Sequence, residues 1–427
     1  MTRISKLQKA LTQGMVEGAD LAQEIYELGE YALADVEDCQ ALQEAIEAWD
    51  ASRATDAPRG FEELQALSGL LQDVSSHEAY EFIRDETLPK LVEIFRREAT
   101  PAARDQDLAE LLFLLKLLAM FQSDEGIECL IEAVHSGFAS EEYLWEVIFQ
   151  IFCDADHPAR EYVANALREP LPRGFAAVTY LDFVNTLARE ELLESHPFDT
   201  PEGLALLNEW LLDPDRFSYA HSAAACLPFL FSPERDSLMA LAMEHVDSGV
   251  QLESAWASAR LGGEGGVKLL ARFAQDLPHA ATAIEYLHEL DRDDAIPESS
   301  REPDFQALAE MCQWLAHPNE FGEPPIELTL FDTRELFWPP TNDRRQVWLF
   351  RYRYPENEAG EAAEEGLGMV GSVTFSLFDE VTVGHSPEDV YALHCCWELE
   401  FQEDPRAPLQ RSIEAGREIL QAAQEAD

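Results

Sequence analysis

Two stretches of the chain match each other when one is shifted by 31 residues. The match places Leu230, Leu238 and Ala240 on Leu261, Leu269 and Ala271. Each stretch contains a helix of small residues, a short break and a second apolar helix. A period of this length is typical of helical-hairpin repeats, in which each unit buries its apolar face only against its neighbours. Arrays of this kind bind partners along an extended surface more often than they catalyse reactions.

The same pattern of two helices and a break extends over about residues 105–318. We predict that the first helices of the hairpins are Leu108–Phe121, Tyr143–Cys153, Phe175–Leu187, Tyr219–Phe231, Leu252–Leu261 and Ala280–Leu290. The second helices begin near Ser123, His157, Thr200, Ser232 and Gly263, so successive starts are 34, 43, 32 and 31 residues apart. Ser or Thr before a Pro is a common helix start, because the hydroxyl caps the first turn and Pro loses no hydrogen bond there.

The segment Ser254–Phe273 (Ser-Ala-Trp-Ala-Ser-Ala-Arg-Leu-Gly-Gly-Glu-Gly-Gly-Val-Lys-Leu-Leu-Ala-Arg-Phe) carries a family resemblance. An Ala-rich helix that closes on Leu-Gly, followed by a helix that opens Gly-Val-x-Leu-Leu, resembles a HEAT-like repeat of the bilin-lyase type. The resemblance implies a mainly α fold, an α-solenoid of HEAT-like hairpins. Lyase activity is a further implication of the resemblance, although only some proteins with such repeats are lyases.

After Pro324-Pro325 the apolar period changes from helical to alternating. The alternation predicts strands at Ile326–Phe331, Gln346–Tyr354, Ser372–Phe378 and Val390–Phe401, followed by a helix at about Pro408–Gln424. We therefore expect a small C-terminal α+β domain, an antiparallel sheet with one helix on a face. The predicted domains are an N-terminal helical segment (1–60, with helices such as Leu21–Tyr31 and Cys39–Trp49), the repeat array (61–320) and the α+β domain (321–427).

The chain is extremely acidic, with 83 Asp and Glu against 30 Lys and Arg and a formal charge of −53. Such a surface repels phosphate backbones and anionic lipid, so we predict neither nucleic acid nor a membrane as a partner. A hydrophobic content of 46% still predicts a folded chain. Two explanations for the acidity stay open: adaptation to a salty cytoplasm, or a surface for a basic partner.

The cysteines are scattered, odd in number and without a CxxC pair, which favours a reducing cytoplasm over a disulfide-stabilised exterior. The first ten residues lack the apolar core of a signal peptide. The most apolar run, Leu108–Phe121, contains Glu110 and Lys116 and is too short to span a bilayer. These features predict a cytoplasmic protein, and its oligomeric state is left open.

The predicted sheet offers one candidate ligand site. If Gln346–Tyr354 and Val390–Phe401 are strands, then Arg351, Arg353 and His394 lie on the sheet face opposite the aromatic residues. These side chains could hold a small anionic group. The alternative is a solvated face on which Arg and Glu pair across strands.

Other motifs do not indicate chemistry. Gly366-Leu-Gly368-Met-Val-Gly371 matches GxGxxG, but a strand follows rather than the helix that a dinucleotide site needs, so we expect a turn or bulge. His394 and Cys396 lack the further ligands that zinc requires. We therefore predict no catalytic residue, no metal and no cofactor.

These features favour a non-enzymatic scaffold or adaptor that binds another protein, with a basic surface or segment, on the helical array. The first alternative is a bilin-lyase-like or chaperone-like factor that handles a cofactor. The second is binding of a small anion by the C-terminal domain through Arg351, Arg353 and His394.

Overall fold

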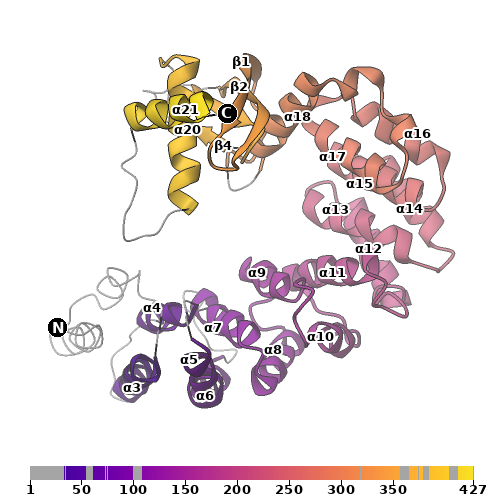
Figure 1. Ribbon diagram of the computed structural model, residues 1–427. Coiled ribbons are helices and arrows are strands. Elements are labelled where there is room, and N and C mark those ends of the chain that lie inside the picture. Colours follow the sequence, from indigo (N-terminus) through magenta and orange to yellow (C-terminus); the bar gives the residue numbers. More distant parts are fainter. Residues whose placement is uncertain are drawn as a thin grey trace. The chain divides into compact units, whose positions relative to one another are not determined.

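The computed structural model describes residues 33, 35–53, 61–72, 74, 76–99, 108–317, 320–355, 365–373, 375–377, 384–402 and 412–426. The described part is mainly helical and contains one small antiparallel sheet (Figure 1). The chain forms two compact units, Met1–Ala242 and Met243–Asp427. This division differs from the one predicted at residues 60 and 320.

The first unit is built from helices. They are α3 (Val36–Arg53), α4 (Glu62–Gly69), α5 (His77–Phe82), α6 (Leu88–Glu98), α7 (Leu108–Met120), α8 (Asp124–Ser136), α9 (Leu144–Ile151), α10 (Arg160–Ala166), α11 (Gly174–Arg189), α12 (Pro201–Leu212), α13 (Phe217–Cys226) and α14 (Arg235–Met243), whose last residue opens the second unit. Short 3₁₀ turns follow α4 and α13, and a π-helical turn (Ile83–Thr87) joins α5 to α6.

The helices of the first unit contact one another in two series. Helices α4, α7, α9, α11 and α13 each contact the next one, and so do α6, α8 and α10. The first series is strongly apolar, and in α7 all the leucines after the first turn are fully buried. Burial on several sides explains why α7 shows no clear polar face, since a helix surrounded by other helices has no need of one.

Two of the predicted helix starts, Ser123 and Thr200, are confirmed by a capping hydrogen bond. The Ser123 hydroxyl accepts a hydrogen bond from the Gly126 amide at 3.3 Å and begins α8. The Thr200 hydroxyl accepts one from the Gly203 amide at 3.1 Å and begins α12, with Pro201 in the first turn. The predicted helix Leu21–Tyr31 lies outside the described residues, whereas Cys39–Trp49 lies inside α3.

The second unit begins with four helices, α15 (Ser248–Arg260), α16 (Glu264–Phe273), α17 (Leu277–Glu289) and α18 (Pro303–Leu315), each in contact with the next. Helices α15 and α16 correspond to the segment that resembles a HEAT-like repeat. Gly266 is buried in their contact, and a Cβ atom there would overlap the carbonyl oxygen of Ala255. Gly266 therefore allows the two helices to approach closely.

The sheet of the second unit has the order β1-β2-β3-β4, with neighbouring strands antiparallel. Its strands are β1 (Glu327–Trp338), β2 (Asp343–Arg353), β3 (Glu365–Val370) and β4 (Phe375–Leu377). The first three predicted strands, Ile326–Phe331, Gln346–Tyr354 and Ser372–Phe378, thus overlap β1, β2 and β4. Strand β3 covers most of the GxGxxG motif, which was predicted as a turn or bulge.

The register explains the glycines of β3. Gly366 lies opposite Tyr352, and Gly368 lies opposite Phe350, so the small residues leave room beside two large rings of β2. Gly371 follows the strand at a φ of 112°, a conformation that residues with a side chain rarely adopt. Within the GxGxxG motif, the backbone therefore leaves the extended conformation at Gly371, whereas Gly366 and Gly368 lie in β3.

Helices cover both faces of the sheet. One face, with Phe350 and Tyr352, packs on Met311 and Leu315 of α18. The other face packs on two later helices, α20 (Pro387–Gln402) and α21 (Ile413–Ala426), whose contact includes Leu349. Figure 1 shows α20 and α21 together on their side of the strands. The sequence predicts only one covering helix and leaves the other sheet face polar.

The segment Val390–Phe401 is a helix, and the prediction of a strand there is wrong. The buried residues of α20 include Tyr391, His394 and Cys395, a spacing of three and four that matches one side of a helix. The Ser386 hydroxyl accepts a hydrogen bond from the Asp389 amide at 3.4 Å and caps the helix. The alternating apolar residues are thus compatible with a helix whose other sides are also partly covered.

Candidate functional site

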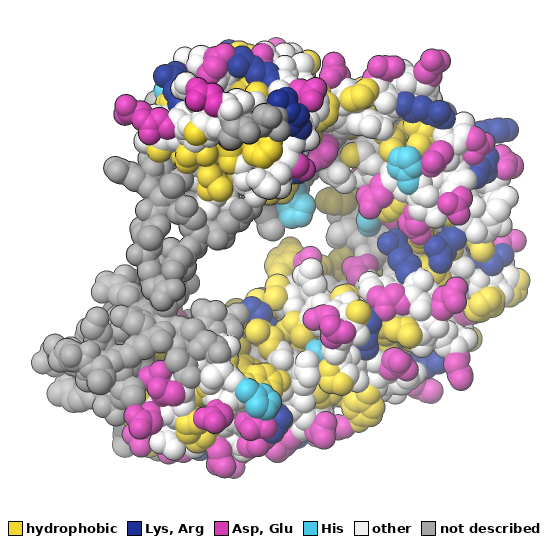
Figure 2. Space-filling view, viewed as in Figure 1, with side chains coloured by type: hydrophobic (Ala, Val, Ile, Leu, Met, Phe, Trp, Pro, Cys, Tyr) yellow, Lys and Arg dark blue, Asp and Glu magenta, His cyan; other side chains and the backbone are white. Residues whose placement is uncertain are grey.

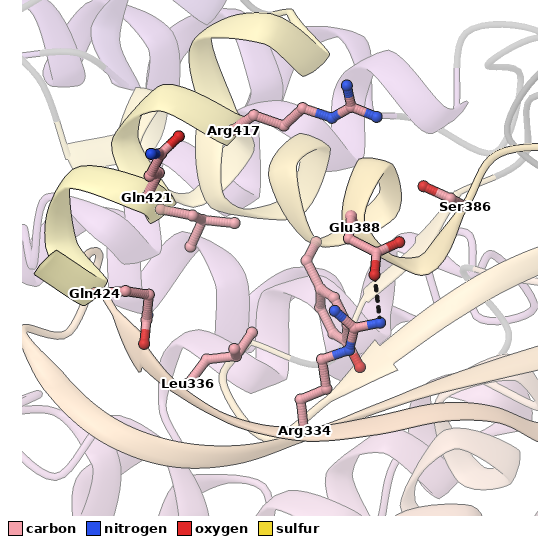
Figure 3. Close-up of a pocket in the computed structure, with 9 residues that line it drawn as sticks. Arg334, Leu336, Ser386, Glu388, Arg417, Gln421 and Gln424 are labelled. Atoms are coloured by element: carbon pink, nitrogen blue, oxygen red, sulfur yellow. Dashed lines mark hydrogen bonds and ion pairs between the residues drawn. The ribbon is translucent and has the colours of Figure 1, made fainter.

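A cavity of about 550 Å³ lies inside the second unit, between β1, α20 and α21 (Figure 3). Its volume falls in the range of roughly 300–1,000 Å³ that is common for small-molecule pockets. Strand β1 contributes Arg334 and Leu336, and the first turns of α20 contribute Glu388 and Tyr391. Helix α21 contributes residues spaced by three and four along one side, namely Arg417, Leu420, Gln421 and Gln424.

Arg334 is held in a fixed orientation in this cavity. Its Nε atom donates to Asp332 at 2.7 Å and its Nη2 atom donates to Glu388 at 2.7 Å. The guanidinium lies over the Tyr391 ring, 5.5 Å from the centroid. Its hydrogen bond holds the pKa of Glu388 below the usual range, so this carboxylate stays charged.

Tyr391 lies beneath Arg334 and is 1% exposed. Burial, and then the charge of the nearby Asp332, raises the pKa of its hydroxyl well above the usual value. The hydroxyl therefore stays protonated at any physiological pH. The ring supplies an apolar wall to the cavity.

The second arginine of the cavity ties α21 to α20. Arg417 of α21 forms an ion pair with Asp389, and the Asp389 carboxylate also accepts a hydrogen bond from the Ser386 hydroxyl at 3.0 Å. Ser386 in turn caps α20. The two arginines of the cavity thus bind neighbouring carboxylates in the first turn of one helix.

Gln424 closes one end of the cavity against the edge of the sheet. Its side-chain amide donates to the Phe337 carbonyl at 2.8 Å, and its oxygen accepts from the Phe337 amide at 3.4 Å. The side chain therefore occupies the position that a further strand would take beside β1. This pairing holds α21 against β1, although the two residues are 87 positions apart in the sequence.

The residues that the sequence predicts as a ligand site lie elsewhere in the second unit. Arg353 is paired with Glu327 by two hydrogen bonds of 3.0 and 2.6 Å. Arg351 lies over the Phe331 ring, 4.8 Å from its centroid. Both side chains extend from β2, and their role in ligand binding stays a prediction.

His394 does not lie on a strand beside them. It belongs to α20 and is 1% exposed, and burial lowers its pKa to about 3. A neutral, buried imidazole offers no positive charge to an anion at neutral pH. The placement on one polar sheet face is therefore wrong for His394, because its segment is helical.

A second candidate is a row of aromatic side chains in the first unit. Tyr143 precedes α9, Phe175 lies in the first turn of α11, and Tyr219 lies in the first turn of α13. Tyr143 contacts Phe175 edge to face at 5.1 Å, and Phe175 lies 6.3 Å from Tyr219. We call these three residues the aromatic row. It runs across the starts of α9, α11 and α13, which contact one another in turn.

In the aromatic row Tyr143 is exposed and the other two rings are partly buried, and both kinds of charge lie nearby. The Tyr143 side chain is 77% exposed. The Arg216 guanidinium lies 5.3 Å from the centre of the Tyr219 ring, so one ring already binds a cation of the same chain. Burial, and then the charge of Glu141, raises the pKa of Tyr219, which places this carboxylate close to the row.

Three side chains in the first unit have the composition of a nucleophile, a base and an orienting amide. The Cys226 thiol lies 3.6 Å from Nδ1 of His196, and Nε2 of His196 lies 3.1 Å from the Asn185 oxygen. All three are buried. Burial raises the pKa of Cys226 well above its usual value and lowers that of His196 to about 3.

These shifts oppose catalysis, because a nucleophilic cysteine needs a thiolate and access to substrate. The three residues come from α11, the loop before α12, and α13. The Asn185 amide also donates to the Ser222 carbonyl at 3.3 Å. The group is therefore a buried hydrogen-bond network that links neighbouring helices.

Within the described ranges, no three His, Cys, Asp or Glu side chains are grouped so that they could hold a metal ion. All seven cysteines are free thiols. Among the helices that the structure describes, none combines the length and the apolar character needed to cross a bilayer.

The sequence did not predict the residues of this cavity as a site, for two reasons. Arg334 lies in the part of β1 beyond Phe331, where the alternation is interrupted by a bulge between Leu330 and Asp332. Tyr391 and Glu388 lie in a helix that was predicted as a strand. One signal could have found them: Ser386-Pro-Glu repeats the helix start seen at Ser232-Pro-Glu.

Comparisons of this chain with protein-family models, with curated proteins and with solved structures found no match.

Proposed function

We propose that the protein is a non-enzymatic scaffold, an α-solenoid of HEAT-like hairpins that binds a basic segment of another protein. The observation that carries this proposal is the aromatic row of Tyr143, Phe175 and Tyr219. A row of rings with Tyr143 exposed, across the starts of helices that contact one another in turn, is a surface on which an extended segment can lie. The rings contribute affinity, and the surrounding carboxylates select positive charge.

Contacts between neighbouring hairpins support the solenoid. Side chains about one repeat apart meet repeatedly, as in His279–Ser248 at 2.7 Å and Gln313–Thr282 at 3.0 Å, each 31 residues apart. In the first unit the Cys153 thiol lies 3.9 Å from the Thr186 hydroxyl, 33 residues away. Contacts of this kind are expected where each repeat packs on the next.

The charge supports a basic partner. On the face shown in Figure 2, Asp and Glu side chains are distributed over helices of both units. Near the aromatic row, Glu141, Glu142 and Glu146 flank Tyr143 in the sequence. A Lys or Arg side chain of the partner would meet the exposed Tyr143 ring and a carboxylate together, as Arg216 meets Tyr219.

The proposal predicts that Tyr143→Ala weakens partner binding by about 3- to 30-fold, the range expected for a lost cation–π contact of about 0.5–2 kcal/mol. The measurement is affinity purification with mass spectrometry at low and high salt, followed by titration of the captured partner. Captured proteins should carry basic segments, and their yield should fall as salt screens the charges.

Tyr162→Ala is the matched control. Tyr162 is also an exposed tyrosine of the first unit, at 52% exposure, but it lies on α10 and binds Glu128. Its loss should leave partner binding unchanged. Capture that resists salt, or that responds equally to both substitutions, would contradict the proposal.

A further inference from the structure

We propose that the cavity between β1, α20 and α21 binds a small organic monocarboxylate with an apolar body. This site is distinct from the aromatic row, which lies in the other unit, and from Arg351, Arg353 and His394. It rests on the hydrogen-bonding capacity, the lining and the charge of the cavity.

Arg334 offers a hydrogen-bond donor that is still open to a ligand in the cavity. The carboxylates beside it, Asp332, Glu388 and Asp389, already bind Arg334 and Arg417. Arg334 uses Nε and Nη2 for these contacts, and among the described residues its Nη1 atom makes no hydrogen bond. A guanidinium with an open edge fits an acceptor, and a carboxylate is the acceptor it binds most strongly.

The lining of the cavity requires an apolar part in the ligand. Leu336 enters from β1 in Figure 3, and Leu420 lines the cavity from α21. The Tyr391 ring, held beneath Arg334, adds a flat wall. A ring or short alkyl chain attached to the carboxylate would cover these surfaces and remove them from water.

The local charge tolerates one negative charge on the ligand better than two. Two guanidinium groups face three carboxylates around the cavity, and the whole chain carries −53. A second negative charge would lie close to Glu388 and Asp389 without a cation of its own. A cationic ligand would have to compete with the arginines that these carboxylates already bind. The cavity therefore discriminates against phosphate and against amines.

The test is isothermal titration of the full-length chain with benzoate, phenylacetate and hexanoate. Benzyl alcohol, benzylamine and inorganic phosphate serve as the neutral, cationic and dianionic comparisons. We expect saturable binding of at least one monocarboxylate, with none of the three comparison compounds binding as tightly. Arg334→Gln and Arg417→Gln should each weaken that binding about tenfold or more, as expected for loss of a charge-assisted hydrogen bond.

Arg353→Gln is the control, because Arg353 pairs with Glu327 on the same sheet but does not line the cavity. It should leave the affinity unchanged. Since Arg334→Gln also removes a contact to α20, the thermal transition of each variant is measured first, and Arg417→Gln carries the test if Arg334→Gln does not fold. Binding that survives both cavity substitutions, binding that is lost in Arg353→Gln, tighter binding of benzylamine or phosphate, or no monocarboxylate binding each overturns the proposal.

Discussion

The helices of the first unit and the sheet with its covering helices in the second unit are stabilised by contacts of different range. In the first unit, side chains meet others about one hairpin away, such as Asn185 and the Ser222 carbonyl, 37 residues apart. Around the sheet, Trp338 meets Glu398 across 60 residues, and Gln424 meets Phe337 across 87. The difference teaches that helices packed on near neighbours can be predicted from local sequence, whereas a sheet joined by distant segments depends on the whole unit.

The largest effect should come from removing a central tryptophan in each region. Trp145 of α9 and Trp338 of β1 are both fully buried, and each donates a hydrogen bond from Nε1 at 2.9 Å. Substitution by Ala should cost about 3–5 kcal/mol in either place because a cavity replaces the ring. The two substitutions should differ in how many neighbouring helices and strands lose stability.

Hydrogen exchange measured by mass spectrometry separates the two outcomes. Trp338→Ala should raise exchange throughout β1–β3, α20 and α21, because these elements share one core. Trp145→Ala should raise it mainly in α7, α9 and α11, the helices in direct contact. If both substitutions loosen both units equally, the difference in contact range has no consequence for stability.

The next effect is a loss of stability in acid, and both regions should show it. His196 in the first unit and His394 in the second have folded pKa values of about 3, because burial disfavours their charged form. In the unfolded chain a histidine takes up a proton near pH 6.5, so the unfolded state binds more protons as the pH falls from 6.5 towards 3. Each histidine should therefore cost about 1.4 kcal/mol per pH unit in this window.

Urea unfolding between pH 6.5 and 5 measures this slope before most carboxylates protonate. His196→Gln or His394→Gln should each remove one histidine's share, about 2 kcal/mol over that interval. A slope that neither substitution changes would show that these imidazoles can charge in the folded protein.

The smallest effect tests close helix contact in the repeat-like part of the second unit. Gly265 and Gly266 are neighbours in α16, but a Cβ at position 265 meets nothing while one at 266 overlaps the Ala255 carbonyl oxygen. Gly266→Ala should destabilise by about 1–3 kcal/mol through overpacking. Gly265→Ala should stabilise by about 0.5–1 kcal/mol, because Ala favours the helix. Thermal melts of the two variants measure both changes in stability. If both variants were stabilised, or both destabilised, the result would contradict the close helix contact at Gly266.

Local signals were sufficient for the helical part. Capping hydroxyls at Ser123 and Thr200 mark helix starts through a contact only three residues long, and the structure uses both. The same reasoning failed at Val390–Phe401, where alternating apolar residues also fit a helix covered on several sides. The sequence Ser386-Pro-Glu is a local signal for the start of this helix.

Only part of the candidate ligand site could be predicted from the sequence. Alternation along β2 correctly separates Arg351 and Arg353 from the aromatic residues, because successive strand residues point to opposite faces. It does not reveal that both faces are covered, since α18, α20 and α21 come from segments far from β2. Arg334 and Arg417 are 83 residues apart and meet neighbouring carboxylates because α20 packs against both β1 and α21.

The sequence by itself determined the mainly helical character, the helix starts at Ser123 and Thr200 and the acidic composition, because each follows from local pattern or composition. The tertiary structure decided that Val390–Phe401 is a helix, that His394 is buried and that a cavity lined by two arginines exists. These features depend on which distant segments share a core. Burial and long-range packing free energies, rather than the preference of any one segment, therefore select them.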